Sequence, residues 1–150
     1  MPRAGPAWRA KLAAVCIRAG TRPANRFAGV GDRLRFFFKK ADRILKRSEF
    51  VELSEIGRKV HTELFLALVA PGRTDRWRLG VTVSRRVGGA VQRTRIKRLV
   101  REYFRLHRHL LQGRFDINVI AKPGAADRPN PAVYLALQEL FEKVSRQIDR

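Results

Sequence analysis

The spacing of apolar and polar residues along the chain predicts four strands. Residues 64–70 form an almost continuous apolar run, which is typical of a buried strand. Residues 76–84 alternate, which predicts a strand with one apolar face and one polar, cationic face. The apolar face holds Trp77, Leu79, Val81 and Val83, and the other holds Arg76, Arg78, Gly80, Thr82 and Ser84. Residues 115–121 predict another strand, and residues 57–61 predict a short one.

Helical spacing predicts a short helix before these strands and a long helix after them. Over residues 48–56, Ser48 is a suitable N-cap, Gly57 is a natural end, and Phe50, Leu53 and Ile56 share one side. The last helix runs to residue 148, with Asn130 as the expected N-cap and Pro131 at its first position. Its apolar face is predicted to contain Val133, Leu137, Leu140, Phe141 and Val144.

The segment 89–111 predicts a helix with two very different sides. At 3.6 residues per turn, one arc is apolar and holds Ile96, Leu99, Val100, Tyr103, Leu106 and Leu110. The opposite arc is basic and holds Arg93, Lys97, Arg98, Arg101, Arg105 and Arg108. Like charges four residues apart destabilise a helix, so stability does not explain this row. We interpret the segment as a folded display of positive charge toward a polyanion.

The overall charge supports that interpretation. Lys and Arg number 33 against 13 Asp and Glu, which gives a net charge of +20 spread along the whole chain. Nucleic acid is the leading class of partner, and an anionic membrane surface is the second. Arg85 and Arg86 precede Gly88 and Gly89 at the start of the basic helix. These glycines either let the backbone approach a ligand or make a tight turn, and the two readings are compatible. The polar face of residues 76–84 fits a nucleic-acid-binding sheet surface and a plain solvated face equally well.

Other classes of protein are less consistent with the composition. Cys16 is the only cysteine, so neither an internal disulfide nor a cysteine zinc site is expected. No apolar run reaches membrane-spanning length, and we expect a cytoplasmic protein. Residues 1–40 read as a basic, mostly disordered extension, although an organelle transit peptide has the same composition. Within it, residues 35–40 are expected to pack on the edge of the domain rather than to stack on bases.

No catalytic constellation is visible. His61, His107 and His109 are not near any plausible nucleophile in the sequence, and we interpret them as structural residues rather than as ligands or bases. The acidic residues are scattered and lack the spacing of a two-metal nuclease. We therefore expect no catalytic residue and no metal site on the protein itself.

The stretch "VTVSRRVGGAVQRTRIKRLVREYFR" resembles the protein subunit of bacterial ribonuclease P. That family has a strand, a basic turn and a helix with the pattern R-N-R-x-K-R-x-x-R. The pattern reads here as Arg93, Thr94, Arg95, Lys97, Arg98 and Arg101. The segments "RILKRSEF", "GRKVH" and "VIAKPGAA" also stand at the family's spacing. The resemblance covers a predicted domain of residues 41–148.

The resemblance implies an α+β sandwich with the order α-β-β-β-α-β-α, a four-stranded sheet and a left-handed βαβ crossover. It also implies a function. In this family the catalytic subunit is RNA, and the protein assists removal of the 5′ leader from precursor tRNA. The implied partners are the catalytic RNA and precursor tRNA, with no membrane and no protein partner. The implied Mg²⁺ belongs to the RNA subunit.

The resemblance further suggests two groups of contact residues. The catalytic RNA is expected to contact Arg85, Arg86, Arg93, Arg95, Lys97, Arg98, Arg101 and Arg105. A cleft between the first helix and the sheet is expected to take the leader, with Arg43, Lys46, Phe50, Ser54, Arg76 and Arg78. Three departures stand out. Thr94 replaces the motif Asn, and Ser54 and Ala67 stand where many members have an aromatic residue.

Three alternatives compete with this reading. A ribosomal or other structural RNA-binding protein would prefer ribosomal RNA to precursor tRNA. A small basic nuclease would cleave RNA without any RNA subunit. A membrane-surface protein would need a helix with an exposed apolar face.

Overall fold

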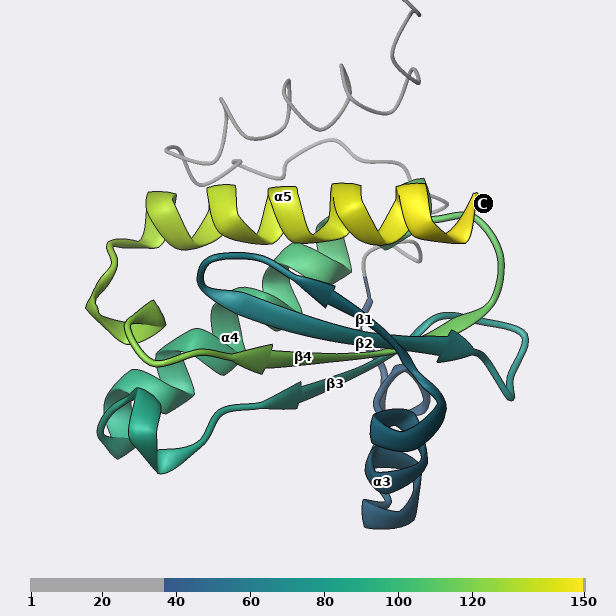
Figure 1. The fold of residues 1–150 in the computed structure, drawn as a ribbon, viewed down its shortest axis with the longest axis horizontal. Coiled ribbons are helices and arrows are strands. Elements are labelled where there is room, and N and C mark those ends of the chain that lie inside the picture. The colour runs from purple at the N-terminus through teal and green to yellow at the C-terminus, as the bar shows by residue number, and fades with distance from the viewer. Residues whose placement is uncertain (1–36, 150) are drawn as a thin grey trace, which may run out of the picture. The chain divides into compact units, whose positions relative to one another are not determined.

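A computed structural model of the chain describes residues 37–149 (Figure 1). The extension predicted for residues 1–40 therefore falls largely outside the described residues. The main elements, in chain order, are α3 (Arg47–Ile56), β1 (Arg58–His61), β2 (Phe65–Pro71), β3 (Arg78–Thr82), α4 (Ala90–His107), β4 (Phe115–Ala121) and α5 (Asn130–Ile148). Short 3-10 helices connect them at Lys40–Asp42, Arg85–Val87, Arg108–Leu110 and Ala125–Asp127. The order confirms the predicted α-β-β-β-α-β-α arrangement.

The four strands form one mixed sheet in the order β1-β2-β4-β3. β2 pairs antiparallel with β1 and with β4, whereas β3 and β4 are parallel neighbours joined through α4. The hand of this crossover stays a prediction. Ahead of α3, the backbone N–H of Ile44 donates to the carbonyl oxygen of Leu79 at 3.1 Å, so this segment covers the outer edge of β3.

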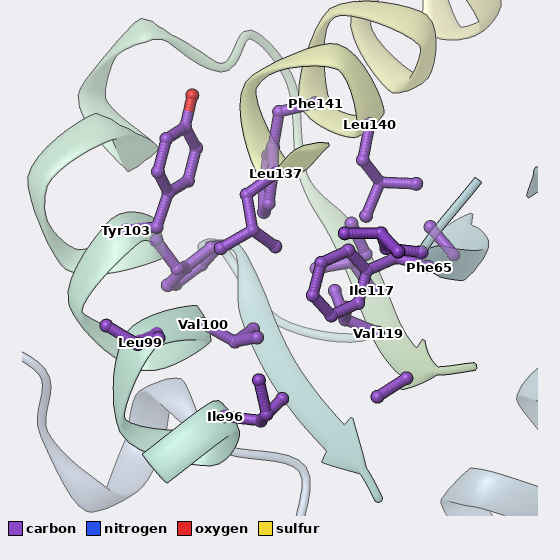
Figure 2. Packing of buried hydrophobic residues seen from close by; sticks show 14 of the residues in the cluster. Phe65, Ile96, Leu99, Val100, Tyr103, Ile117, Val119, Leu137, Leu140 and Phe141 are labelled. Atoms are coloured by element: carbon purple, nitrogen blue, oxygen red, sulfur yellow. The ribbon is translucent and has the colours of Figure 1, made fainter. Parts of the chain in front are cut away.

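The helices cover both faces of the sheet (Figure 1). α4 and α5 pack on one face, and α3 packs on the other. Figure 2 shows the larger core, in which side chains of α4 and α5 meet Phe65, Ile117 and Val119 of the sheet. The smaller core, under α3, contains Ile44, Leu53, Leu68 and Ala70, with Phe50 and Ile120 partly buried beside them. The buried strand residues therefore divide between two cores on opposite faces of the sheet.

The apolar face of α5 was predicted correctly, and that of α4 only in part. All five predicted residues of α5 are buried. In α4, Leu106 is only half buried, whereas Phe104 and His107 are buried. α4 ends at His107 and a tighter 3-10 turn follows, so Leu110 is also only half buried. A uniform period of 3.6 residues does not describe that last turn.

The predicted helix starts need small corrections. Lys46, not Ser48, is the N-cap of α3, and its side chain makes no capping hydrogen bond. Pro129, not Asn130, is the N-cap of α5. Gly57 does end α3, and its N–H donates to the Leu53 carbonyl oxygen at 3.0 Å. Ile56 is 64% exposed, contrary to the prediction that it shares the buried side of α3.

Residues just before the first helix are anchored on the domain. The Phe38 ring meets the Phe104 ring edge-on, with centroids 5.8 Å apart, and the Arg43 guanidinium lies 5.0 Å from the Phe38 ring centroid. Phe38 is packed against the larger core. Phe38 therefore matches the expectation for residues 35–40, whereas Phe37 is 52% exposed and residues 35 and 36 lie outside the described residues.

Candidate nucleic-acid interface

The outer side of α4 displays basic residues without acidic partners. Ile96, Val100 and Phe104 are fully buried and hold the helix on the sheet. Arg93, Lys97 and Arg101 are half buried and Arg98 is exposed. Within residues 37–149, none of these four side chains forms an ion pair, whereas Arg105 pairs with Glu102 at 3.1 Å and Arg108 with Asp42 at 2.9 Å. The unpaired cations of this row therefore lie toward the first two-thirds of the helix.

Arg101 lies close to a second positive charge. Burial and the charge of Arg43 both lower the pKa of Arg101 from its ordinary value. The guanidinium remains protonated at neutral pH because an unperturbed Arg titrates far above it. Arg43 belongs to the segment beside β3, so two different elements bring like charges together. A phosphate placed near them would relieve this repulsion.

The turn before α4 is built by its own residues. Arg85 and Arg86 are exposed in the 3-10 turn that leads to it. The Gln92 side-chain oxygen accepts a hydrogen bond from the Gly89 N–H at 3.0 Å. A Cβ at Gly88 would lie 2.1 Å from that same oxygen, whereas a Cβ at Gly89 would meet nothing within 4 Å. Gly88 thus permits the close approach of Gln92, and the tight-turn reading explains it without a ligand.

Two residues of the motif are committed to internal hydrogen bonds. The Thr94 hydroxyl donates to the Ala90 carbonyl oxygen at 3.0 Å, so its single proton is used within α4. The Arg95 guanidinium donates to the Arg128 carbonyl oxygen and ties α4 to the loop before α5. Thr94 and Arg95 line an open depression of about 490 Å³ together with Ala90, Val91 and Arg98. Val91 is 84% exposed there, which gives this end of the basic surface an apolar patch.

The sheet face beside α3 forms a second candidate surface. Phe50 of α3 lies over Gly80 of β3, where an added Cβ would be 2.5 Å from the ring. The Thr82 hydroxyl donates to the Asn118 side-chain oxygen at 3.1 Å across β3 and β4. Asn118 was not predicted as a site residue, although the alternation of residues 115–121 places it on this face. An aromatic ring and a polar pair therefore lie side by side on one sheet face.

The structure revises the role expected of Arg78. Its side chain is 9% exposed, and its Nε and Nη2 donate to the two Asp116 carboxylate oxygens at 2.9 and 2.5 Å. Its Nη1 donates to Glu49 of α3 at 2.9 Å. The hydrogen bond that Arg78 donates to Asp116 raises the pKa of Arg78, and the one that it donates to Glu49 lowers the pKa of Glu49. The charge of Arg78 is satisfied inside the protein, so we assign it to holding α3 on the sheet.

The other residues predicted for the leader cleft are more accessible. Arg43, Lys46 and Ser54 are exposed, and the Ser54 hydroxyl donates to the Val51 carbonyl oxygen at 2.6 Å. Arg76 is partly neutralised by Asp42 at 3.6 Å and by Asp75 at 3.5 Å. A cavity of about 20 Å³ lies under α3, and its lining carboxylates, Glu49, Glu52 and Asp116, are already paired with its lining arginines, Arg73 and Arg78. That cavity does not suit a polyanion.

Ala67 does not belong to this surface. It is fully buried in the larger core, on the face of β2 that α4 and α5 cover. The expectation that it marks a missing aromatic residue beside the leader is therefore wrong. Neighbouring strand residues point to opposite faces, so Leu68, buried in the smaller core, faces α3 instead.

Of the three histidines, His107 is buried within α4, whereas His61 lies in β1 rather than in a helix. The Nδ1 of His107 lies 2.8 Å from the Tyr103 carbonyl oxygen, its ring stacks on the Tyr103 ring, and burial lowers its pKa. His61 and His109 are exposed. Among residues 37–149, no group of three or more His, Cys, Asp and Glu side chains could hold a metal ion. The helices of that same part of the chain are too short or too polar to cross a membrane.

Comparison with known sequences identifies close relatives. A family model described as Ribonuclease P matches residues 38–145. The Ribonuclease P protein component of Desulfosudis oleivorans is 52% identical over 112 residues, which cover 75% of this chain and 93% of that protein. The Ribonuclease P protein component of Desulforapulum autotrophicum is 47% identical over 111 residues, which cover 74% of this chain and 95% of that protein.

Solved structures share the fold. The RNase P protein of Staphylococcus aureus superposes with a TM-score of 0.65 at 33% identity, covering 69% of this chain and 94% of that one. The RNase P protein of Thermotoga maritima gives a TM-score of 0.61 at 30% identity, covering 67% of this chain and 94% of that one. Both match over nearly their whole length.

Proposed function

The chain belongs to the family of ribonuclease P protein components, and on that premise we propose that it binds RNA through two separate surfaces. Family membership makes it a subunit of a ribonuclease P holoenzyme with a role in tRNA 5′ processing. The outer side of α4 and the preceding turn contact the catalytic RNA. The sheet face beside α3 contacts the single-stranded 5′ leader of precursor tRNA.

The row of unpaired cations on α4 carries the first half of the proposal. A merely solvated helix normally mixes acidic residues into its exposed side, and they form pairs four residues apart. Here Arg93, Lys97, Arg98 and Arg101 have no ion-pair partner within residues 37–149. Arginine suits phosphate because its planar guanidinium donates two parallel hydrogen bonds. A folded RNA would neutralise this row, which the acidic residues of the described part of the chain leave unpaired.

Phe50 supports the second half. Its ring is half buried over Gly80, and exposed Lys46 lies just before α3, whereas the Arg43 guanidinium lies on the Phe38 ring at the larger core. Stacking of unpaired bases on an aromatic ring, combined with flanking cations, is a common way to hold single-stranded RNA. On this surface Ser54 offers no aromatic ring for stacking, and the charge of Arg78 is already paired with Asp116 and Glu49. We therefore expect leader binding to depend on few residues.

The chemistry is assigned to the RNA subunit. The protein would act by neutralising phosphates of the RNA and by positioning the leader, which are tasks of binding rather than of bond cleavage. We assign the Mg²⁺ of the reaction to the RNA as well, because the cationic side of α4 repels a divalent cation. The proposed place of action is the cytoplasm.

The decisive experiment measures cleavage of a precursor tRNA at low Mg²⁺. Three samples are compared: ribonuclease P RNA alone, this RNA with the protein, and the protein alone. We expect cleavage only when both subunits are present. An Arg93→Ala/Arg98→Ala variant should require more protein for the same rate, whereas Arg114→Ala, an exposed change outside both surfaces, should not. Cleavage by the protein alone would contradict the proposal.

A further inference from the structure

A second cationic site lies on the edge of the sheet that is farthest from β3. Among residues 37–149, β1 pairs with β2 alone, and α5 runs over this edge (Figure 1). Between them lies an open pocket of about 380 Å³, lined by Lys59, Val60, His61, Lys143, Arg146 and Gln147. None of these residues belongs to the surfaces described above.

The backbone of β1 points hydrogen-bonding groups into this pocket. In an antiparallel pair, alternate residues exchange hydrogen bonds with the partner strand, and those between them face outward. Thr62 N–H donates to the Phe65 carbonyl oxygen at 2.9 Å, and the same register pairs Val60 with Ala67. The N–H groups of Lys59 and His61 therefore face the open edge. Consistently, Lys143 Nζ of α5 reaches the outward carbonyl oxygen of His61 at 3.5 Å.

The charges around the pocket leave an excess of positive charge. On α5, Lys143 pairs with Glu139 at 2.7 Å and Arg146 with Glu142 at 3.8 Å. Arg58 and Lys59 of β1 are exposed, and neither has an acidic partner within residues 37–149. Arg58 instead donates to the Gln147 carbonyl oxygen at 3.0 Å, which fixes β1 to the end of α5. The pocket lining thus holds three cations, Lys59, Lys143 and Arg146, and no carboxylate, beside two outward N–H groups.

We propose that this pocket between β1 and α5 binds a phosphate of an RNA backbone, as a site separate from α4. Outward N–H groups and flanking cations together are the groups that recognise a phosphate. Three strand spacings, roughly 15 Å, separate β1 from β3, so this site lies at the edge of the sheet opposite the strand that α4 contacts. The protein would thus hold two RNA segments on opposite edges of its sheet. That the phosphate comes from RNA rests on the proposed function.

An added strand from a second protein is the less favoured occupant. β1 has only four residues, and Lys143 already occupies the carbonyl oxygen of His61. Strand addition needs free carbonyl groups as well as free N–H groups along the edge. A phosphate needs only the donors and the positive charge.

The test follows the amide NMR signals of Lys59 and His61 in the isotope-labelled full chain while a short oligouridylate is added at physiological ionic strength. We expect saturable shifts of both signals. The shifts should be lost in Lys59→Gln/Arg146→Gln and kept in Lys40→Gln/Arg114→Gln, which removes the same charge from exposed positions elsewhere. They should also be kept in Arg93→Ala/Arg98→Ala, whose α4 signals should no longer respond.

Three results would overturn the proposal. The first is that the Lys59 and His61 signals do not respond while α4 signals do, which leaves the proposed function intact. The second is that both double glutamine variants lose the shifts equally, which indicates net charge rather than a site. The third is that these signals depend on protein concentration without RNA, which indicates pairing between two copies. If the Lys59 and His61 signals shift on adding oligouridylate but the α4 signals do not, the result would count against the proposed function instead.

Discussion

At the scale of single residues, Arg78 has the most constrained environment on the face beside α3. Its guanidinium joins β4 through Asp116 and α3 through Glu49. Sequence alternation placed Arg78 on the correct face of its strand but suggested a free cation. It could not show that two carboxylates, from residues 29 and 38 positions away, would meet it there. Because Arg78 is buried and paired, a mutation there is expected to lower the stability of the fold rather than the affinity for RNA.

Replacing Arg78 by Ala should destabilise the fold strongly. Removing one partner of a buried ion pair typically costs about 3–5 kcal/mol, because the remaining carboxylates stay buried and uncompensated. Urea unfolding followed by circular dichroism measures the loss. Arg76→Ala, at a more exposed and weakly paired position, should cost about 1 kcal/mol or less. Equal stabilities of the two variants would contradict the role assigned to Arg78.

The same pairing predicts a pH dependence. The hydrogen bond from Arg78 lowers the pKa of Glu49 below its ordinary value of 4.5, so the unfolded chain binds this proton more readily than the folded one. The stabilisation is present above pH 4.5 and is lost as the pH falls through the lower, folded-state value. Wild type should therefore lose more free energy of unfolding between pH 6 and acid conditions, about pH 3, than Glu49→Gln does. If the free energy of unfolding changes with pH equally in wild type and Glu49→Gln, the ionised Glu49 contributes no stability.

Thr94 offers a test of the one departure inside the basic motif. Because its proton is used by the Ala90 carbonyl oxygen, Thr94→Val should leave affinity for the catalytic RNA unchanged. Thr94→Asn should supply a free amide donor and tighten binding by about 1 kcal/mol, roughly fivefold in Kd. Filter binding of the catalytic RNA measures both. Weaker binding by Thr94→Val would show that the hydroxyl does contact the RNA.

At the scale of elements, the spacing of apolar residues correctly predicted strands and helix faces that are packed in the interior. The limits of β4 and the buried side of α5 follow directly from the pattern because apolar runs there have only one way to face the core. The spacing of apolar residues is less informative where contacts with neighbouring elements determine whether a residue is buried. The side of Ala67 was expected from the family resemblance rather than from the pattern, and in a strand a shift of one residue reverses the side. Phe104 lies four residues after Val100 and His107 four after Tyr103, so both fall on the buried side of α4 at ordinary helical spacing.

α3 carries the prediction for leader binding. Phe50→Ala should weaken the affinity for a precursor tRNA with a leader by about 1–3 kcal/mol while leaving a leaderless tRNA unaffected. Ser54→Phe, one helical turn further along the exposed side, should add a ring and strengthen leader binding. Fluorescence titration with the assembled holoenzyme measures both. An unchanged Phe50→Ala affinity would place the leader elsewhere, and its unfolding curve serves as the control for lost packing over Gly80.

At the scale of the whole molecule, the net charge of +20 predicts a steep salt dependence. If the protein neutralises about six phosphates, the logarithm of its affinity for the catalytic RNA should fall with the logarithm of salt at a slope of roughly −4 to −5. Arg93→Ala should flatten that slope by about one unit. Titrations at several salt concentrations measure it. A wild-type slope near −1 would contradict the electrostatic basis of binding.

The strand order has a consequence for how the chain folds. β2 and β3 follow each other in sequence, but β4 lies between them in the sheet. During synthesis, the β1–β2 hairpin is the part of the sheet that can form before β4 is made, because within residues 37–149 β3 pairs with no strand other than β4. Until the sheet is complete, the apolar side of α4 has no surface to pack against and stays exposed to solvent. Late closure by a central strand slows folding and leaves apolar surface exposed to misassociation. β4 is thus the strand whose arrival completes the domain.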